Sequence, residues 1–144
     1  MILVIDASVA VKWFVAEPRR DQARDVLRPE FDLIAPELIL VEVANALRNK
    51  VRNSLADKSL MQTALIKLTG IFDRLINARE ALDEAFEMAC GINHPVADCV
   101  YLACAIQNDA VFLTDDAKLH QKAMTIGGKL KSTLLIDWTP GLPV

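Results

Sequence analysis

The chain has 144 residues, of which 53% are hydrophobic and 24% are charged, and its formal net charge is −3. A chain of this length suits a single domain, residues 1–144, which can bury about 70% of its unfolded surface without disulfides. The slight acidity argues against broad electrostatic binding of nucleic acid, although it is compatible with a local basic patch.

Neither membrane insertion nor secretion is expected. No apolar run reaches the ~18 residues of a membrane span, and the N-terminus lacks the basic region and long apolar core of a signal peptide. The three cysteines are odd in number and lie in apolar helical sequence, which is typical of reduced core residues. We therefore expect a cytoplasmic protein.

Strand and helix patterns alternate along the chain. Residues 2–5 form an apolar run that is β-branched at three of its four positions, which predicts a strand buried on both faces of a parallel sheet. Further strands are predicted at 33–35, 110–113 and 134–136, and helices at 7–15, 21–27, 37–52, 56–75, 79–90, 95–106 and 117–124. This alternation predicts an α/β sandwich in which helices flank a central, mostly parallel sheet.

Four acidic residues lie where the local sequence does not favour a charge. Asp6 ends the first buried run, and Asp116 comes just after the third predicted strand. Glu42 has apolar residues on both sides, and Asp98 lies in the first turn of a very apolar helix. Buried acids are costly unless they are paired or bind a metal. These four residues are therefore the candidates for a functional site.

Each acid also has a simpler interpretation when it is taken singly. Asp6, Ser8 and Asp116 are residue types that cap the helix that follows them. Asp98 gains from the positive end of its own helix, and Glu42 can pair with a nearby arginine. Four such exceptions in one small domain, two of them at strand ends on the same sheet edge, favour a shared site.

Four converging carboxylates require a counter-ion, because each like-charge pair at ~4 Å costs about 4 kcal/mol at an effective dielectric constant of about 20. An all-carboxylate site with no histidine or cysteine favours Mg²⁺ or Mn²⁺ over zinc and suits phosphodiester hydrolysis. Ser8 and Thr114 are candidates to orient a carboxylate or a water. Asn45, one turn after Glu42, is expected to face the same pocket. The two histidines lack the spacing of a metal pair and are assigned no role.

Taken in order, these residues resemble the four motifs of PIN-domain nucleases, and most closely those of the VapC-type toxins of bacterial toxin–antitoxin pairs. The motifs are Asp6-Ala7-Ser8, Glu42 with Asn45, Asp98-Cys99-Val100-Tyr101-Leu102-Ala103, and Thr114-Asp115-Asp116. The resemblance extends from Met1 to about Trp138. It implies a PIN-like fold and a Mg²⁺- or Mn²⁺-dependent endoribonuclease, usually dimeric and inhibited by a VapB-type antitoxin.

The resemblance also assigns roles within the acid set. Asp6, Glu42, Asp98 and Asp116 match the family's catalytic and metal-binding acids. Asp116 matches because the last motif has the pattern Thr-x-Asp. Asp115 occupies the variable position of that motif, so its role stays open.

Two other classes of protein are compatible with parts of the sequence. A haloacid-dehalogenase-like phosphatase also has an aspartate after its first strand, but it needs a second aspartate where this chain has Ser8. It also gives Glu42 and Asp98 no role. A non-catalytic PIN-fold binding module is the third possibility, and the complete acid set counts against it.

A partner surface is expected on the helical face of the molecule. The predicted helices 7–15, 37–52 and 56–75 carry more apolar residues than one small sheet can cover. An apolar segment of an antitoxin can fill a groove on such a face. The residues expected around this groove are Trp13, Phe14, Leu60 and Met61. Each of them can equally complete the core or a homodimer interface.

Overall fold

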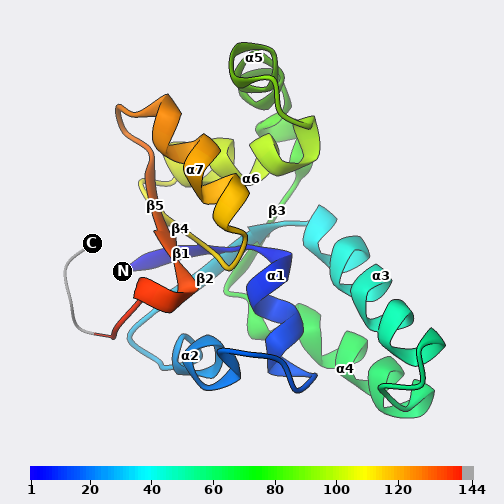
Figure 1. Cartoon of the computed structure of the whole chain (residues 1–144). Coiled ribbons are helices and arrows are strands. Elements are labelled where there is room, and N and C mark those ends of the chain that lie inside the picture. Colours follow the sequence, from blue (N-terminus) through cyan, green and yellow to red (C-terminus); the bar gives the residue numbers. More distant parts are fainter. Residues whose placement is uncertain (141–144) are drawn as a thin grey trace.

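The computed structural model describes residues 1–140 and has a five-stranded sheet at its centre (Figure 1). The strand order is β3-β2-β1-β4-β5, and every neighbouring pair is parallel. The strands are β1 (Ile2–Ile5), β2 (Asp32–Pro36), β3 (Arg74–Ile76), β4 (Val111–Thr114) and β5 (Lys131–Leu134). The expected α/β architecture with a parallel sheet is confirmed.

Helices cover both faces of this sheet. In Figure 1, α5, α6 and α7 gather above the sheet, α1 and α2 lie below it, and the α3–α4 pair extends to the right. The α-helices are α1 (Ala7–Ala10), α2 (Arg20–Asp25), α3 (Leu38–Arg52), α4 (Lys58–Ile71), α5 (Leu82–Ile92), α6 (Val96–Gln107) and α7 (Ala117–Ile126). Short 3-10 turns are η1 (Val11–Trp13), η2 (Ala78–Glu80) and η3 (Leu135–Asp137).

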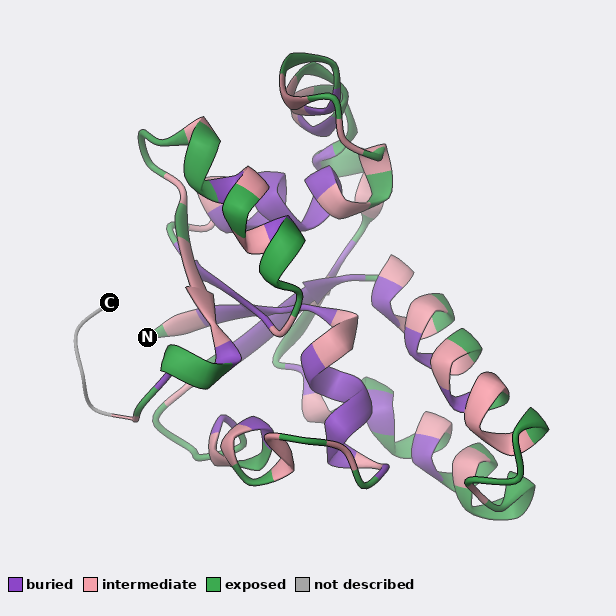
Figure 2. Ribbon diagram, in the orientation of Figure 1, coloured by how far each residue is buried: buried purple, intermediate pink, exposed green. Residues whose placement is uncertain are grey.

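The core lies between the sheet and helix α6. Strand β1 is central, and its residues Leu3, Val4 and Ile5 are fully buried, as the continuous apolar run predicts. Figure 2 shows the same buried colour along the inner strands and on α6. Residues from Cys99 to Ala105 are all buried because α6 contacts β1, β2 and β4. The carboxyl ends of the central strands are therefore fixed by the best-packed part of the molecule.

The segment predicted as one helix over 56–75 contains a strand that the sequence pattern hides. Helix α4 ends at Ile71, and Arg74–Ile76 forms β3 beside β2. The prediction failed because the apolar spacing of the helix continues into Leu75, and a three-residue strand is too short to show its own period.

Three other boundaries differ from the predictions. The last strand is Lys131–Leu134, three residues earlier than expected, and the apolar residues after it form η3. The predicted helix 7–15 is α1 followed by the 3-10 turn η1. The helix predicted over 79–90 is α5, which ends at Ile92 and is capped by Asn93 with a left-handed φ of 52°.

Two of the three cysteines are buried, as the sequence predicts, and the third is not. Cys99 and Cys104 are buried free thiols, but Cys90 is exposed on α5. Over residues 1–140, no helix taken alone has the length and apolar character of a membrane span. Helices α5 and α6 meet that test only as a pair, and they are bent by 119° at their junction.

Candidate active site

The adjacent strands β1 and β4 bring Asp6 and Thr114 together. The backbone N–H of Asp6 donates to the Leu113 carbonyl at 3.0 Å, which continues the ladder between the two strands. Asp6 is 7% exposed, and its Oδ2 accepts hydrogen bonds from Ser8 Oγ at 2.6 Å and from Thr114 Oγ1 at 2.7 Å. Two hydroxyls on one oxygen hold this carboxylate in a single orientation.

Glu42 approaches the site from α3 and is held by a tyrosine. The Tyr101 hydroxyl donates to Glu42 Oε1 at 2.5 Å, and it comes from α6, 59 residues away in the sequence. Glu42 is therefore paired with a phenol rather than with the arginine that the sequence allowed.

Asp98 lies in the first turn of α6 and is held by a histidine. His94 Nε2 is 2.7 Å from Asp98 Oδ2, and the His94 side chain is the more buried of the two. The spacing i, i+4 was visible in the sequence, but the turn at Asn93-His94-Pro95 indicated only a helix start. His94 is thus a residue of the site that the sequence analysis missed.

Asp6 and Glu42 lie close enough to other acids for a neighbouring charge to affect their pKa values. Burial raises the pKa of Asp6; the hydrogen bonds from Ser8 and Thr114 oppose this, and the charge of Asp98 adds to it. Burial also raises the pKa of Glu42; the hydrogen bond from Tyr101 opposes this, and the charges of Asp6 and Asp98 add to it. Like charges at this edge of the sheet therefore raise the cost of ionising Asp6 and Glu42, and a bound cation would relieve that cost.

The two aspartates of the motif Thr114-Asp115-Asp116 have different hydrogen-bond partners. Asp116 is exposed, and its Oδ1 accepts the backbone N–H of Leu119 at 3.0 Å, so it caps α7. Its own N–H donates to Thr114 Oγ1 at 3.0 Å, which joins the cap to the Asp6 network. The capping role considered for Asp116 is thus present in the structure.

Asp115 has an ionic environment that the sequence did not reveal. Arg19 binds it through two nitrogens at 2.6 and 2.8 Å, and Lys12 Nζ lies 3.1 Å away. Burial opposes its ionisation, but the hydrogen bonds from Arg19 and Lys12 outweigh this and lower its pKa. Its backbone N–H donates to Ser8 Oγ at 2.9 Å. Asp115 therefore anchors the β4–α7 loop to the segment after β1.

The donor set matches a hard divalent cation in chemistry. Asp6, Glu42 and Asp98 supply carboxylate oxygens, which are the ligands preferred by Mg²⁺ and Mn²⁺. In the part of the chain that the structure describes, no three His, Cys, Asp or Glu side chains are grouped tightly enough to hold one ion. Asn45 is exposed on α3, one turn beyond Glu42. The acids therefore fit a divalent cation by the chemistry of their oxygens, and not by an already assembled set of three ligands.

Both aromatic residues expected at the partner groove, Trp13 and Phe14, take part in the core instead. Trp13 is buried, and its Nε1 donates to the Ala23 carbonyl at 2.8 Å. Its ring contacts Phe14 and Phe72. Phe14 is half-buried against the same cluster, so the core interpretation holds for both residues.

Comparison with known proteins defines the class of this fold and site. A family model described as the PIN domain matches residues 3–124. The chain therefore belongs to the PIN-domain family. Ribonuclease VapC3 of Pyrobaculum aerophilum is 32% identical over 124 residues, which cover 85% of this chain and 95% of that protein. This similarity makes the chain a VapC-type member of the family.

Solved structures agree on the fold. The chain is similar to PAE2754 from Pyrobaculum aerophilum, with a TM-score of 0.61 and 21% identity over 85% of this chain and 84% of that one. It is also similar to a chain in the structure of VapBC2 from Rickettsia felis bound to a DNA fragment from their promoter. That match has a TM-score of 0.64 and 13% identity over 93% of this chain and 98% of the other.

Proposed function

We propose that this chain is a Mg²⁺- or Mn²⁺-dependent endoribonuclease and the toxin of a toxin–antitoxin pair. The observation that carries the proposal is the group of three acids formed by Asp6 at the carboxyl end of β1, Glu42 of α3 and Asp98 of α6. The charge of Asp98 raises the pKa of both Asp6 and Glu42, which places it near them. Ligands bind at this edge in open α/β sheets. The similarity to Ribonuclease VapC3 supports RNA as the substrate.

In this proposal some residues of the cluster would bind the metal, and others orient the metal-binding residues. Asp6, Glu42 and Asp98 hold the metal, and Asp116 completes the acid set from the start of α7. When bound, the ion activates a water and stabilises charge on the scissile phosphate. Ser8 and Thr114 keep the Asp6 carboxylate in the orientation that their hydrogen bonds define. Asn45 contacts substrate or a bound water at the rim of the pocket.

Chelation and metal replacement test this proposal directly. EDTA is expected to stop RNA cleavage, and Mg²⁺ or Mn²⁺ to restore it. Calcium is expected to restore it poorly, because its looser coordination suits the reaction geometry less well. RNA binding should show a shallow salt dependence, as a modest basic patch contacts only a few phosphates. Full cleavage in excess chelator would exclude the metal mechanism.

The two alternatives predict different results in the same assays. A haloacid-dehalogenase-like phosphatase hydrolyses a generic phosphomonoester, but Ser8 stands in place of its second aspartate and donates to Asp6. A non-catalytic binding module binds metal without cleaving either substrate. Cleavage of RNA without phosphomonoester hydrolysis is the result that we expect.

We further propose that an apolar segment of a VapB-type antitoxin binds between α3 and α4. A cavity of about 200 Å³ opens between these helices. Its lining residues are Ala44, Leu47, Arg48, Val51, Lys58, Met61, Gln62 and Leu65. Met61 was expected at such a groove, and Leu60 next to it is exposed. The VapBC2 structure of Rickettsia felis gives a precedent for a chain of this fold in such a complex.

The working form that we propose is a cytoplasmic homodimer in which residues 1–144 form a single PIN domain. A higher assembly forms with the antitoxin. Size-exclusion chromatography with light scattering on the free chain tests the dimer.

A further inference from the structure

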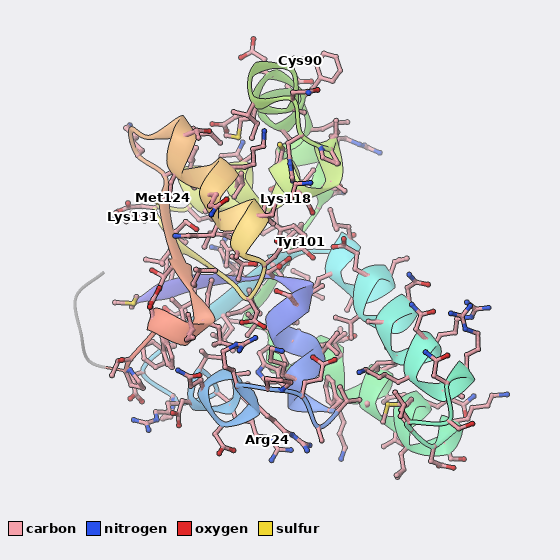
Figure 3. All side chains as sticks on the ribbon, viewed as in Figure 1. Arg24, Cys90, Tyr101, Lys118, Met124 and Lys131 are labelled. Atoms are coloured by element: carbon pink, nitrogen blue, oxygen red, sulfur yellow. The ribbon has the colours of Figure 1, made fainter. Side chains whose placement is uncertain are left out.

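Tyr101 is a buried polar side chain at the centre of the acidic cluster. It lies on α6 one helical turn after Asp98 and is 0% exposed. Its ring packs against Phe112 of β4, with ring centroids 6.0 Å apart and an interplanar angle of 47°. Figure 3 shows Tyr101 near the centre of the molecule, close to where α3 begins. Packing therefore fixes the position of the hydroxyl group before any ligand arrives.

The Tyr101 hydroxyl is hydrogen-bonded to one of the three acids and lies within range of the charges of the other two. It donates to Glu42 Oε1 at 2.5 Å. Burial raises its pKa far above the usual range of a phenol, and the charges of Asp6, Glu42 and Asp98 raise it further. In this pair the phenol O–H is the donor and the carboxylate oxygen is the acceptor.

Glu42 depends on this donor for its orientation. It lies on the surface of α3, and its carboxyl group is separated from the backbone by three rotatable bonds. The hydrogen bond to Oε1 restricts that freedom and engages only one of the two carboxylate oxygens. A carboxylate has lone pairs on both oxygens, so Oε2 remains available to another ligand.

We propose that Tyr101 is a positioning residue for the metal site: its hydroxyl fixes Glu42 Oε1 so that Oε2 is presented to the cation. This inference rests on the proposed function of Asp6, Glu42 and Asp98 as metal ligands. Hydrogen-bond partners behind metal ligands typically account for about 10- to 100-fold in metal affinity. A purely structural role, in which Glu42 only satisfies a buried phenol, gives no such effect.

The test is Mn²⁺ binding by the full chain, measured by isothermal titration calorimetry. Tyr101→Phe removes the hydroxyl and keeps the ring against Phe112. We expect it to raise the dissociation constant for Mn²⁺ by about 10- to 100-fold. Glu42→Gln provides the second arm of a double-mutant cycle. Tyr101→Phe should have no further effect in the Glu42→Gln background, because the residue through which it acts is already changed.

Trp13→Phe is the matched control, because it removes a different buried aromatic donor. The Trp13 Nε1 bond to the Ala23 carbonyl lies in the core beneath α2. This variant should lose stability and keep wild-type Mn²⁺ affinity. Circular dichroism at the temperature of the titration verifies that each variant is folded.

The possible results distinguish a failure of the Tyr101 proposal from a failure of the proposed metal site. If the wild type does not bind Mn²⁺, or Asp6→Asn binds it equally well, the metal site is wrong and the role of Tyr101 falls with it. If Asp6→Asn loses Mn²⁺ while Tyr101→Phe binds it with wild-type affinity, only the role of Tyr101 is wrong. Weakening by Tyr101→Phe that persists in the Glu42→Gln background also contradicts it.

Discussion

The buried carboxylate of Asp6 lowers the stability of the fold and also belongs to the proposed metal site. It continues a fully buried strand, and its carboxylate is compensated by the two hydroxyls of Ser8 and Thr114. Those hydrogen bonds do not cancel the burial, because the pKa of Asp6 remains raised. In the metal-free protein the ionised form is therefore a source of instability.

Asp6→Asn should stabilise the metal-free protein and abolish the activity. Because the pKa of Asp6 is raised in the folded state, its ionised form costs stability at neutral pH, and that cost disappears as the pH falls below the ordinary aspartate pKa of 3.8. The gain from Asp6→Asn should therefore be present at pH 7 and vanish in acid. Loss of the metal should reduce RNA cleavage more than about a hundredfold.

Urea unfolding in EDTA at neutral and acidic pH, together with an RNA cleavage assay, checks both parts. A wild-type cleavage rate for Asp6→Asn would show that the site is misassigned. A loss of stability at pH 7 would show that the cost of burying the ionised Asp6 carboxylate is not the dominant effect.

Substitution of Asp115 should lower the stability of the fold, whereas substitution of Asp116 should lower the affinity for metal. Asp115→Asn leaves the buried Lys12, which is 4% exposed, with one carboxylate partner fewer, and should lower the free energy of unfolding by about 1–3 kcal/mol. Asp116→Asn should keep the fold, because asparagine caps a helix about as well as aspartate. We expect Mn²⁺ affinity to fall for Asp116→Asn and to stay near wild type for Asp115→Asn. The opposite ranking in calorimetry would reverse the two assignments.

At the scale of elements, one network of ion pairs connects four separate segments: η1, the loop before α2, α3 and the β4–α7 loop. Lys12 of η1 binds Glu17 and Asp115, each at 3.1 Å, and Lys50 of α3 binds Glu17 at 3.0 Å. The network fastens the loop before α2 to both α3 and the β4–α7 loop. It therefore supports the acidic cluster from outside.

Glu17→Gln should weaken the fold in a pH-dependent way. Burial opposes the ionisation of Glu17, but the hydrogen bonds from Lys50 and Lys12 outweigh this and lower its pKa below 4.5. A lowered pKa contributes stability above the unfolded value, and this contribution is lost as the pH falls through the folded value. The variant should therefore be less stable by at most about 1 kcal/mol at pH 7, since the pair is partly exposed.

Chemical denaturation of wild type and Glu17→Gln from pH 3 to pH 7 measures this difference. Asp25→Asn is a suitable control, because its ion pair with Arg28 is solvent-exposed. A difference between Glu17→Gln and wild type that persists unchanged in acid would contradict the ionic explanation.

The elements that the sequence predicted well are those with long apolar periods. The helix predicted over 37–52 is found at Leu38–Arg52, and the one over 95–106 is found at Val96–Gln107. Strand β3 was missed because it has three residues and follows a helix with the same apolar spacing. Strand β5 was misplaced because it is only partly buried, while the apolar run after it fills the core through Leu135.

At the scale of the whole molecule, the sequence does not reveal contacts between residues that lie far apart along the chain. The four acids were candidates because each contradicts its own local pattern. Thr114, 108 residues from Asp6, was a candidate only because it stands beside Asp115 and Asp116 in the last motif. Tyr101, the partner of Glu42, lies 59 residues away and gave no local signal of this pairing. The ionic anchoring of Asp115 by Arg19 spans 96 residues and was invisible for the same reason.

The last prediction concerns the groove between α3 and α4, and rests on its apolar lining. An apolar segment that enters this cavity must contact Met61 of α4, so Met61→Glu places a charge where the partner buries apolar surface. We expect Met61→Glu to cleave RNA normally and to escape inhibition when it is co-expressed with the small protein encoded by the upstream open reading frame. Ile66→Glu is the matched control, because Ile66 is on the same helix, is 81% exposed and does not line the cavity.

Co-purification and growth measure the two consequences together. Wild type and Ile66→Glu should be recovered as an inactive complex from healthy cells. Met61→Glu should be recovered without the partner and should arrest growth, because the free energy of binding is concentrated in a few buried apolar contacts. Recovery of Met61→Glu in a full-yield, inactive complex would mean that the partner binds elsewhere. Harmless expression of the wild-type chain alone would contradict the toxin proposal, while RNA cleavage in vitro would still support the nuclease.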